Sequence, residues 1–586
     1  MTSNPLHDVV IVGVGNTEQG KRLEGHTSFS IAVEAVRLAL ADAGLSPGDV
    51  DGSVGAMGGD LEYQLRIGPA WRGMGPANAG GVVTAALAIA AGMATTVVVA
   101  DGGAAVHTDR AKTAPWTRPE NEFVIPWGMF TAAEFALIAR HHMHTFDTPV
   151  EALATVAATI RNNGSINPDA VMAGRGPYSA ADVLASPMIA DPFHRLDCAI
   201  DSEGGAALVL TTAERARDLP GVAVRLLGGS GDRFGPAYKH PPAWSFGSRT
   251  DLVNGWIGRR AADQAFAMAG LGRNDVDVAE LYDPFSFEII RQLEAFRFCA
   301  EGEAAGFVLD GHISPDATLP VTTDGGVLSF SHPGASAQML QRVIRAAQQL
   351  RGTCATNQVS GAEVAFVSNG GAGALFSDVL LLGADHVVAV GKSRSVGGSR
   401  ANADASSSTP ANALSSVPSP PATSATAATS GSEVGEAVIS DPQAWLAPQP
   451  QGIAPTMTNP VSAPLWEGAA AGELRYQFCE ACEIPVMDPQ PACPQCLVQS
   501  LAWRISEGLG EIESYSVVWR APLPRLEVPY APAIVRLDEG YSMLTNITGC
   551  QVGDLAVGKR VTVHFAEIDG ATLPYFAPSE HTDQQR

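Results

Sequence analysis

Cysteine is missing from the first 197 residues of this chain, and basic side chains are few throughout. Its 586 residues include 37 Lys and Arg against 61 Asp and Glu, which leaves a formal net charge of −24. Nucleic acid is therefore not expected as a partner, because phosphate binding needs concentrated positive charge. Only 17% of the residues are charged and 46% are hydrophobic, which is enough apolar surface for well-packed cores in two or three domains.

Long runs of large apolar residues are also missing. Residues 73–100 carry no charge and are long enough to cross a membrane, but they are mainly glycine, alanine and threonine and include Pro76 and Asn78. We expect a buried helix and a buried strand there.

The chain opens on a strand-like apolar run rather than on a charged leader with a cleavage site. The expectation is a soluble, cytoplasmic protein without membrane insertion.

Half of the eight cysteines lie close together, in the pattern Cys479-x2-Cys482-x10-Cys493-x2-Cys496. Two CxxC pairs at this spacing supply four thiolates that converge tetrahedrally on zinc and leave no position for water. The site is therefore expected to be structural, clamping a module too small to build its own core. The other cysteines are scattered singly, which is typical of reduced core residues rather than of a secreted disulfide framework.

Composition divides the chain into three parts. Residues 389–437 consist largely of Ala, Ser, Pro, Thr and Gly without apolar periodicity, which predicts a disordered linker. In residues 1–388 short β-branched runs alternate with longer helical patterns, the signature of an α/β domain with buried strands. Residues 438–586 hold the cysteine cluster and then short strands with turns, which suggests a small β-barrel.

Periodicity places individual elements within these parts. In the first part, strands are expected at residues 8–15, 95–103, 205–211, 278–283, 364–371 and 378–383. Helices are expected at residues 29–44, 131–146, 149–164 and 337–352. After the linker, strands are expected at residues 511–521, 530–540, 542–549 and 559–568.

A single histidine stands in a glycine-rich turn, TDGGVLSFSHPGAS, at residues 323–336. The glycines allow a sharp turn or a close approach to a ligand. His332 is the one side chain of this stretch that exchanges protons near neutral pH, so it is a candidate catalytic residue.

The cysteine cluster belongs to a longer pattern. Residues 465–496, 501–518 and 529–540 together resemble the acyl-CoA-associated zinc-ribbon/OB-fold family, over roughly residues 455 to 580. Members of that family are typically partners of thiolase-fold enzymes. An OB barrel alone would suggest oligonucleotide binding, but the acidic charge and the absence of a basic, aromatic-rich strand face argue against it here.

The first part resembles the thiolase superfamily in its sterol-carrier-protein-type, lipid-transfer branch. The segments that carry the resemblance are residues 9–21, 161–219, 278–307, 319–337 and 367–373. The resemblance implies a layered αβαβα fold of two similar halves, normally dimeric, with the zinc-ribbon and OB-type barrel packed on it. It also matches His332 to the histidine of the family's Gly-His-Pro turn, with Ser331 in place of the glycine.

The nucleophile of that family is absent. Thiolases carry an acyl-accepting cysteine ahead of a buried helix, and this position falls on Gly75, with Asn78 at a motif glycine. Since no cysteine precedes Cys198, a shifted alignment does not supply one. The family's second cysteine falls on Ser368. A serine nucleophile there is conceivable but has no evident third group.

Tyr282 occupies the position of the histidine in the family's His-Asp-Cys-Phe motif. A phenol can donate or accept a proton but does not form an acyl-enzyme. This pattern of departures resembles the lipid-transfer-type aldolases of steroid side-chain degradation, which pair a cysteine-less thiolase fold with a zinc-ribbon/OB partner. A packed core tyrosine is the competing interpretation.

The resemblance therefore predicts a carbon–carbon lyase that cleaves a 3-hydroxyacyl-CoA, with a steroid or other bulky side chain, by a retro-aldol reaction. We expect Tyr282 to handle the proton of the β-hydroxyl and His332 to serve as oxyanion donor or Cα proton source, or the two to exchange these roles. Coenzyme A enters as part of the substrate, through residues that the sequence does not identify. The alternatives are a non-catalytic acyl-CoA or lipid binder, and a thiolase or acyltransferase with an atypical nucleophile.

One histidine cluster is not expected to act. The stretch ARHHMHTF contains His141, His142 and His144, but no acidic or cysteine partner stands at ligand spacing. We interpret it as a solvated helix end.

Overall fold

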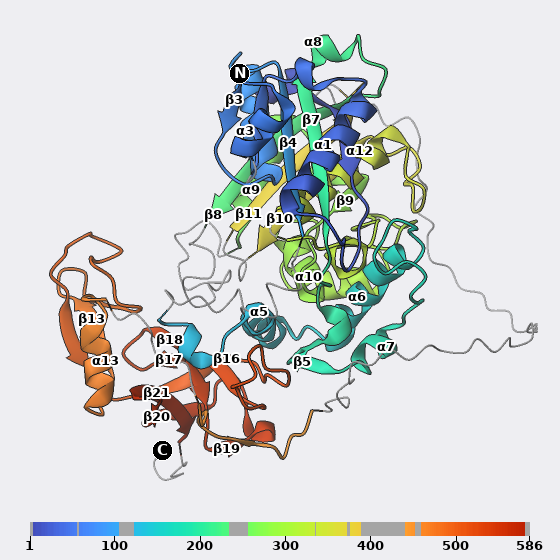
Figure 1. The fold of residues 1–586 in the computed structure, drawn as a ribbon. Helices are drawn as coiled ribbons and strands as arrows, with labels where there is room; N and C mark the ends of the chain where they lie inside the picture. The colour runs from blue at the N-terminus through green and yellow to red at the C-terminus, as the bar shows by residue number, and fades with distance from the viewer. Residues whose placement is uncertain are drawn as a thin grey trace, which may run out of the picture.

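The structure is a computed structural model that describes residues 4–55, 58–104, 122–233, 256–334, 336–371, 376–387, 440–451 and 459–579 (Figure 1). The linker predicted at residues 389–437 lies outside these ranges. Among the helices described, none has the length and apolarity that a membrane span requires.

One mixed sheet of nine strands forms the centre of the first part, in the order β3-β2-β4-β7-β1-β8-β11-β10-β9. The strands are β1 (Val9–Asn16), β2 (Gly52–Val54), β3 (Trp71–Gly73), β4 (Thr96–Gly103), β7 (Gly204–Thr212), β8 (Val224–Arg233), β9 (Val278–Glu280), β10 (Val364–Gly371) and β11 (Phe376–Ala384). The helices are α1 (Ser28–Ala43), α2 (Gly58–Leu65), α3 (Ala79–Ala90), α5 (Thr131–Phe146), α6 (Val150–Ser165), α7 (Ala180–Leu184), α8 (Ala213–Ala216), α9 (Arg259–Ala269), α10 (Ser286–Ala295), α11 (Ala304–Leu309) and α12 (Ala337–Arg351).

The sheet consists of two similar halves. From β1 outward, β7 and β4 pair antiparallel and β2 pairs parallel. From β8 outward, β11 and β10 pair antiparallel and β9 pairs parallel, which repeats the same pattern. The halves meet where Val10 and Ile11 of β1 pair with Arg225 and Val224 of β8. The predicted fold of two similar halves is confirmed.

Helices cover both faces of each half, because successive strand residues point to opposite sides. Val9 and Ile11 pack with residues of α3 and α12 in one core that both halves share. Val10 and Val12 face the other way and pack against α1. On the second half, Phe366 and other strand residues pack against α9. The layers therefore follow in the order α1, the first half of the sheet, α3 with α12, the second half of the sheet, and α9. This is the expected αβαβα arrangement.

Local sequence fixes the ends of these helices. The Thr27 side chain accepts a hydrogen bond from the backbone of Ser30 in a capping box, and α1 ends at Gly44, whose φ is +69°. Asn78 caps α3 by accepting from the backbone N–H of Gly81 at 2.9 Å. The uncharged stretch thus forms the buried helix and strand that its composition predicts.

The C-terminal part is a zinc-ribbon-like unit followed by a closed barrel. The first comprises α13 (Ala463–Ala470), β13 (Arg475–Cys479), β14 (Ile484–Val486) and β15 (Ala502–Ile505). The barrel is closed in the order β16-β17-β18-β21-β20, from β16 (Leu509–Tyr515), β17 (Ala531–Leu537), β18 (Ser542–Ile547), β20 (Arg560–Ile568) and β21 (Ala571–Pro578). A short pair, β12 (Trp445–Leu446) with β19 (Cys550–Gln551), flanks it.

The barrel packs on the first part through α5, which lies between them in Figure 1. The Ser514 hydroxyl of β16 donates to the carbonyl of Leu137 in α5 at 2.7 Å. The Tyr530 hydroxyl donates to the carbonyl of Gly128 at 2.6 Å, just ahead of the same helix. Apolar residues of the barrel join the core of the second half, so the two parts share buried surface.

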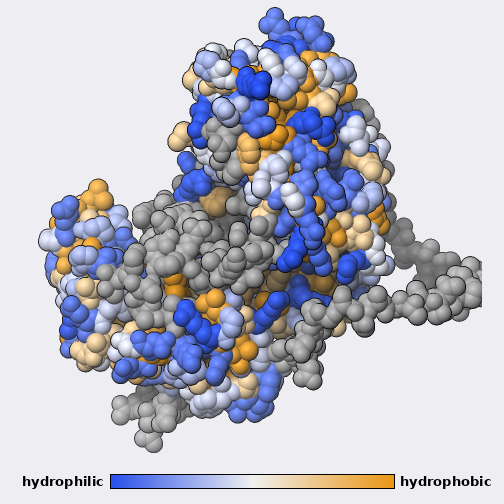
Figure 2. Space-filling view, viewed as in Figure 1, coloured by the Kyte–Doolittle hydropathy of each residue, from blue (hydrophilic) through white to orange (hydrophobic). Residues whose placement is uncertain are grey.

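The described surface is mixed. Figure 2 shows hydrophilic and hydrophobic residues interspersed over one face of both parts. Tyr63, Met74 and Leu497 are the most exposed large apolar side chains among those described, and they stand singly along the chain.

Candidate active site and candidate metal centre

Tyr282 lies between β9 and α10, and only 5% of it is exposed. Its backbone is held from both sides, since its N–H donates to the hydroxyl of Ser368 at 3.2 Å and its carbonyl accepts from Gln292 Nε2 at 2.6 Å. The phenol oxygen accepts a hydrogen bond from Nε2 of Gln338 in α12 at 3.3 Å. The phenol is therefore directed towards the beginning of α12 rather than into an apolar core.

Asp283, the next residue, ties this segment to the one that carries His332. Its carboxylate accepts from the backbone N–H groups of Val327 at 2.9 Å and Leu328 at 3.1 Å, in the π-helical turn Gly326–Phe330. The approach requires glycine at position 326, where φ is +57° and a Cβ would lie 2.0 Å from Asp283 Oδ2. Burial raises the pKa of this carboxyl to about 6.

His332 follows that turn and is partly buried. Its backbone N–H donates to the hydroxyl of Ser202 at 2.7 Å, and its Nδ1 lies 2.8 Å from the carbonyl oxygen of Ile200. Because a carbonyl only accepts, Nδ1 carries the hydrogen, and in the neutral ring Nε2 is the basic nitrogen. The ring is therefore held in one tautomer.

A chain of hydrogen-bonded hydroxyl and amide groups continues from Ser202, which accepts from the His332 backbone. The hydroxyls of Ser202 and Ser331 lie 2.8 Å apart, and the Ser331 hydroxyl donates to Gln19 Oε1 at 2.7 Å. Gln341 Nε2 donates to the same oxygen at 2.9 Å. Sequence reasoning missed Gln19 and Ser202, because nothing in their local pattern distinguishes them from ordinary polar loop residues.

The position matched to the thiolase nucleophile is open. Gly75 has φ +117°, and no atom of the described residues lies within 4 Å of the place a Cβ would occupy. The Asn78 side chain has a structural role, because its oxygen caps α3 and its Nδ2 donates to Asp378 at 3.1 Å.

Ser368 is fully buried and its hydroxyl is already used on both sides. It accepts from the Tyr282 backbone and donates to Gln292 Oε1. Gln292 in turn holds the Tyr282 carbonyl. The geometry makes Ser368 part of the support of Tyr282 and does not favour it as a nucleophile.

The histidines at the end of α5 differ from the expected solvated helix end. His142 is fully buried, with Nε2 2.9 Å from Glu294 Oε2 and Nδ1 3.0 Å from the Thr148 hydroxyl. His141 is partly buried and faces the barrel, with Nδ1 3.4 Å from the carbonyl of Glu513. Of the three, only His144 is exposed. The prediction was wrong because α10 and the barrel cover this end of the helix, which the local sequence does not reveal.

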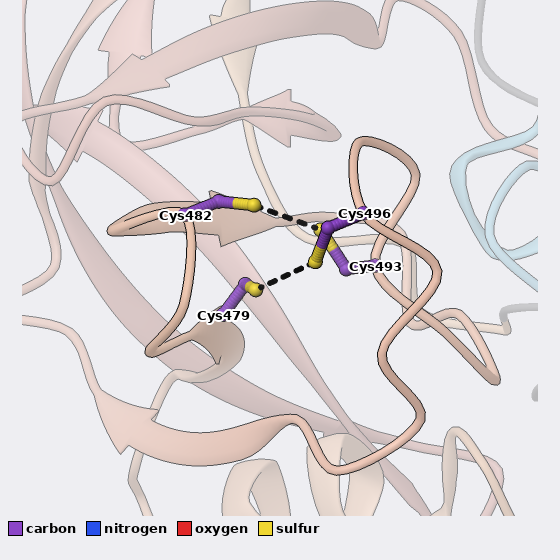
Figure 3. Close-up of side chains that lie close together, drawn as sticks. All are labelled: Cys479, Cys482, Cys493 and Cys496. Atoms are coloured by element: carbon purple, nitrogen blue, oxygen red, sulfur yellow. Dashed lines mark hydrogen bonds between the residues drawn. The ribbon is translucent and has the colours of Figure 1, made fainter.

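The four clustered cysteines converge as the spacing predicts (Figure 3). Their sulfur atoms all lie within 4.8 Å of one another. Cys479 Sγ is 3.6 Å from Cys496 Sγ, and Cys493 Sγ is 3.9 Å from Cys482 Sγ. Four sulfurs at about 2.3 Å from a tetrahedral zinc ion are about 3.8 Å apart, so the cluster fits zinc.

Family comparisons agree with this architecture. Residues 242–384 match the model of the thiolase C-terminal domain-like family, residues 466–502 match the ChsH2 rubredoxin-like zinc ribbon domain, and residues 503–566 match the ChsH2 C-terminal OB-fold domain. The fold and these matches define a thiolase-like protein with a zinc ribbon and an OB fold on the same chain.

Individual relatives narrow the family. The chain is 33% identical to a steroid side-chain-cleaving aldolase of Thermomonospora curvata, over 55% of this chain and 86% of that protein. It is also 33% identical to the 17-hydroxy-3-oxo-4-pregnene-20-carboxyl-CoA lyase of Mycobacterium tuberculosis, over 61% of this chain and 95% of that enzyme. The chain belongs to the thiolase-like family that contains these two proteins.

Solved structures extend the likeness. The Ltp2-ChsH2(DUF35) aldolase is 30% identical, with a TM-score of 0.56, over 66% of this chain and all of that chain. A monomeric SCP2-thiolase like protein type 1 from Mycobacterium smegmatis shares the fold at a TM-score of 0.59 and 17% identity, over 98% of this chain and 99% of that one.

Proposed function

We propose that this protein cleaves the Cα–Cβ bond of a 3-hydroxyacyl-CoA by a retro-aldol reaction, without a cysteine nucleophile. The products are a ketone or aldehyde and a shortened acyl-CoA, and the acyl chain is a steroid side chain or a similarly bulky group. One observation carries the proposal. Gly75 is matched to the position of the thiolase cysteine, while Tyr282 and His332 lie on two segments that the hydrogen bonds of Asp283 join. The names of the relatives support the same reaction class.

The hydrogen bonds of the two side chains favour His332 as the base. With Nδ1 donating to Ile200, Nε2 of neutral His332 can take the proton of the β-hydroxyl. The freed electron pair forms the carbonyl of the leaving ketone, and the electrons of the broken Cα–Cβ bond pass into the thioester as an enolate.

Tyr282 then stabilises the charge that develops. Its oxygen accepts from Gln338, and we assign its O–H the role of donor to the thioester oxygen. The protonated His332 returns its proton to Cα, which restores the neutral ring and completes the shortened acyl-CoA. This assignment exchanges the two roles expected first from the sequence.

The test is to incubate the protein with a tertiary 3-hydroxyacyl-CoA and to measure ketone and shortened acyl-CoA. We expect both products in equal amounts without added free CoA. A strict requirement for free CoA would indicate thiolysis, which needs an acyl-accepting side chain. Tight binding without any product would indicate a non-catalytic acyl-CoA or lipid binder.

The zinc-ribbon part is proposed to hold one structural zinc ion through Cys479, Cys482, Cys493 and Cys496. The ion supplies a cross-link between the two CxxC turns when it is bound, and all four protein ligands are sulfur, so no coordination position is left for catalysis. Cys479 and Cys493 are buried, which shields two of the ligands from solvent.

The predictions on domains, substrate cofactor, assembly and localisation are part of the same proposal. The domains are taken as residues 1–388, 389–437 and 438–586, coenzyme A as part of the substrate, and the assembly as a homodimer formed through the thiolase-like domain in the cytoplasm. The contacts between α5 and the barrel support a C-terminal part that remains packed on the first.

A further inference from the structure

The phenol of Tyr282 has one nearby amide that bears on its ionisation. Gln338 Nε2 donates to the phenol oxygen at 3.3 Å, in a place where both side chains are almost fully buried. A hydrogen bond donated to a phenol oxygen favours the charged form over the neutral one, and it acts more strongly away from water. The O–H of Tyr282 is thereby made a better donor to a substrate oxygen.

The position of Gln338 adds to this effect. It is the second residue of α12, a helix of 15 residues. The first turn of a helix carries a partial positive charge from its unpaired N–H groups, which favours negative charge close by. The amide therefore connects the phenol to a part of the fold that stabilises developing charge.

The fold itself gains little from a glutamine at this position. The carbonyl oxygen of the Gln338 amide is buried and has no hydrogen-bond partner within the part of the chain described. A buried acceptor without a donor destabilises the folded state, and an apolar side chain of the same length would avoid that cost. Among the described residues, the one hydrogen bond of the amide is the one that it donates to Tyr282.

Gln349, at the other end of the same helix, shows the contrast. Its Nε2 donates to the Thr323 hydroxyl at 2.8 Å and to the carbonyl of Asn357 at 2.7 Å. Its Oε1 accepts from the backbone of Val359 at 2.8 Å and from Gln358 at 3.0 Å. Gln349 is a satisfied structural residue, whereas Gln338 is not.

We propose that Gln338 is a positioning residue that aims the Tyr282 hydroxyl at the thioester oxygen and makes it more acidic. The inference rests on the proposed function, because it assigns the hydroxyl the task of stabilising the enolate. Gln338 acts through Tyr282 and not on the reacting atoms.

The test measures the phenol directly. All tyrosines of the full chain are replaced by 3-fluorotyrosine, and the Tyr282 fluorine resonance is identified by its loss in a Tyr282→Phe variant. Gln338→Met keeps the length and removes the donor, so we expect the ionisation constant of this phenol to fall about tenfold or more. Gln338→Glu places a carboxylate there and is expected to lower it further. An unchanged midpoint in Gln338→Met overturns the proposal.

Stability provides the matched control. Gln338→Met is expected to keep or raise the melting temperature, while Gln349→Met lowers it and leaves the Tyr282 resonance unchanged. In steady-state kinetics Gln338→Met should lower kcat about tenfold or more with little change in KM, because the lost interaction acts in the transition state. A fall in melting temperature as large as that of Gln349→Met, with normal titration of Tyr282, would assign Gln338 a structural role instead.

The two proposals fail separately. If no 3-hydroxyacyl-CoA is cleaved but the Gln338→Met titration shifts as expected, the retro-aldol function is wrong and the link between Gln338 and Tyr282 stands. If cleavage proceeds and the titration does not shift, the function stands and the role of Gln338 is wrong.

Discussion

The backbone N–H of Tyr282 donates a hydrogen bond to the hydroxyl of Ser368, at 3.2 Å. The resemblance to thiolases matches these two residues to a histidine and to the second cysteine of that family. The serine therefore holds the tyrosine in place, and its hydroxyl is also bonded to Gln292. Tyr282 and Ser368, which both differ from the thiolase pattern in this match, thus belong to one hydrogen-bonded unit.

Replacing Tyr282 with phenylalanine removes one oxygen and keeps the ring that fills the site. The backbone bonds to Ser368 and Gln292 are unaffected, so the fold should be retained. We expect the rate of ketone release to fall about a hundredfold or more, since a group that donates to the enolate oxygen is lost. Product formation from a tertiary 3-hydroxyacyl-CoA measures this. A variant with full activity would remove Tyr282 from the mechanism.

Replacing His332 with asparagine removes the proposed base and keeps an amide N–H close to the position of Nδ1, which donates to Ile200. We expect kcat/KM to fall by about 10² to 10⁴. In the unmodified protein kcat/KM should decline as the imidazole becomes protonated at acid pH, because only the neutral ring accepts the β-hydroxyl proton. The pH profile of the residual activity checks the assignment, since this acid limb should be absent from it. Persistence of the same limb would point to another base.

Removing one of the proposed zinc ligands should act mainly on the zinc-ribbon unit. In Cys493→Ser we expect loss of the bound zinc and a lower melting temperature of the zinc-ribbon unit, because the metal replaces a core that this unit lacks. Metal analysis of the purified protein and thermal denaturation measure both effects. Cys550→Ser, which changes a buried cysteine outside the cluster, is the control and should keep its zinc. Full zinc content in Cys493→Ser would contradict the proposed site.

Glu134 of α5 makes stability depend on pH. It is 3% exposed, its Oε1 has no hydrogen-bond partner in the part of the chain that the structure describes, and burial raises its pKa to about 8. Between about pH 4.5 and pH 8 the folded state keeps a proton that the unfolded state has lost. Stability therefore falls as pH rises through this window, by up to about 1.4 kcal/mol per unit.

The isosteric Glu134→Gln variant isolates this contribution. We expect it to melt at a higher temperature than the unmodified protein at pH 8 and to differ little at pH 4.5, where the carboxyl is neutral in the folded state and only about half ionised in the unfolded state. Thermal denaturation across this range provides the measurement. A constant difference between the two proteins at all pH values would show that Glu134 does not titrate as described.

Glu122 fastens the first part to the zinc-ribbon unit. The residue is 4% exposed, and its carboxylate accepts from Asn459 at 2.8 Å, from the Ser462 hydroxyl at 2.7 Å and from Trp466 Nε1 at 2.7 Å. If the predicted linker is cut by limited proteolysis, we expect the two fragments to remain together on gel filtration.

In Glu122→Ala the three donors lose their acceptor, so dissociation of the cut fragments should increase tenfold or more. Glu473→Ala is the matched control, since that carboxylate pairs within the C-terminal part with Arg475 and is partly exposed. Equal dissociation of both variants would mean that the Glu122 contacts do not hold the parts together.

Much of the fold was predictable because helices and strands depend on the local periodicity of apolar residues. The helix expected at residues 131–146 is α5 without any change in its bounds, and the strands expected near residues 96, 205 and 365 all form. β8 was not among the expected strands, because its run of glycines, VRLLGGSGDR, hides the apolar alternation. β8 pairs with β1 and β11 across most of its length, and that pairing stabilises it despite the glycines.

The sequence by itself determined the α/β pattern, the convergence of the four cysteines and the absence of a thiol ahead of Cys198, because each depends on residues close together or on composition. The tertiary structure alone decided what surrounds the candidate catalytic groups. Gln338 is 56 residues from Tyr282, and Ile200 is 132 residues from His332. Local spacing fixes which face of an element is apolar, but the packing of distant elements selects the polar groups that meet, and those contacts determine hydrogen bonding and ionisation.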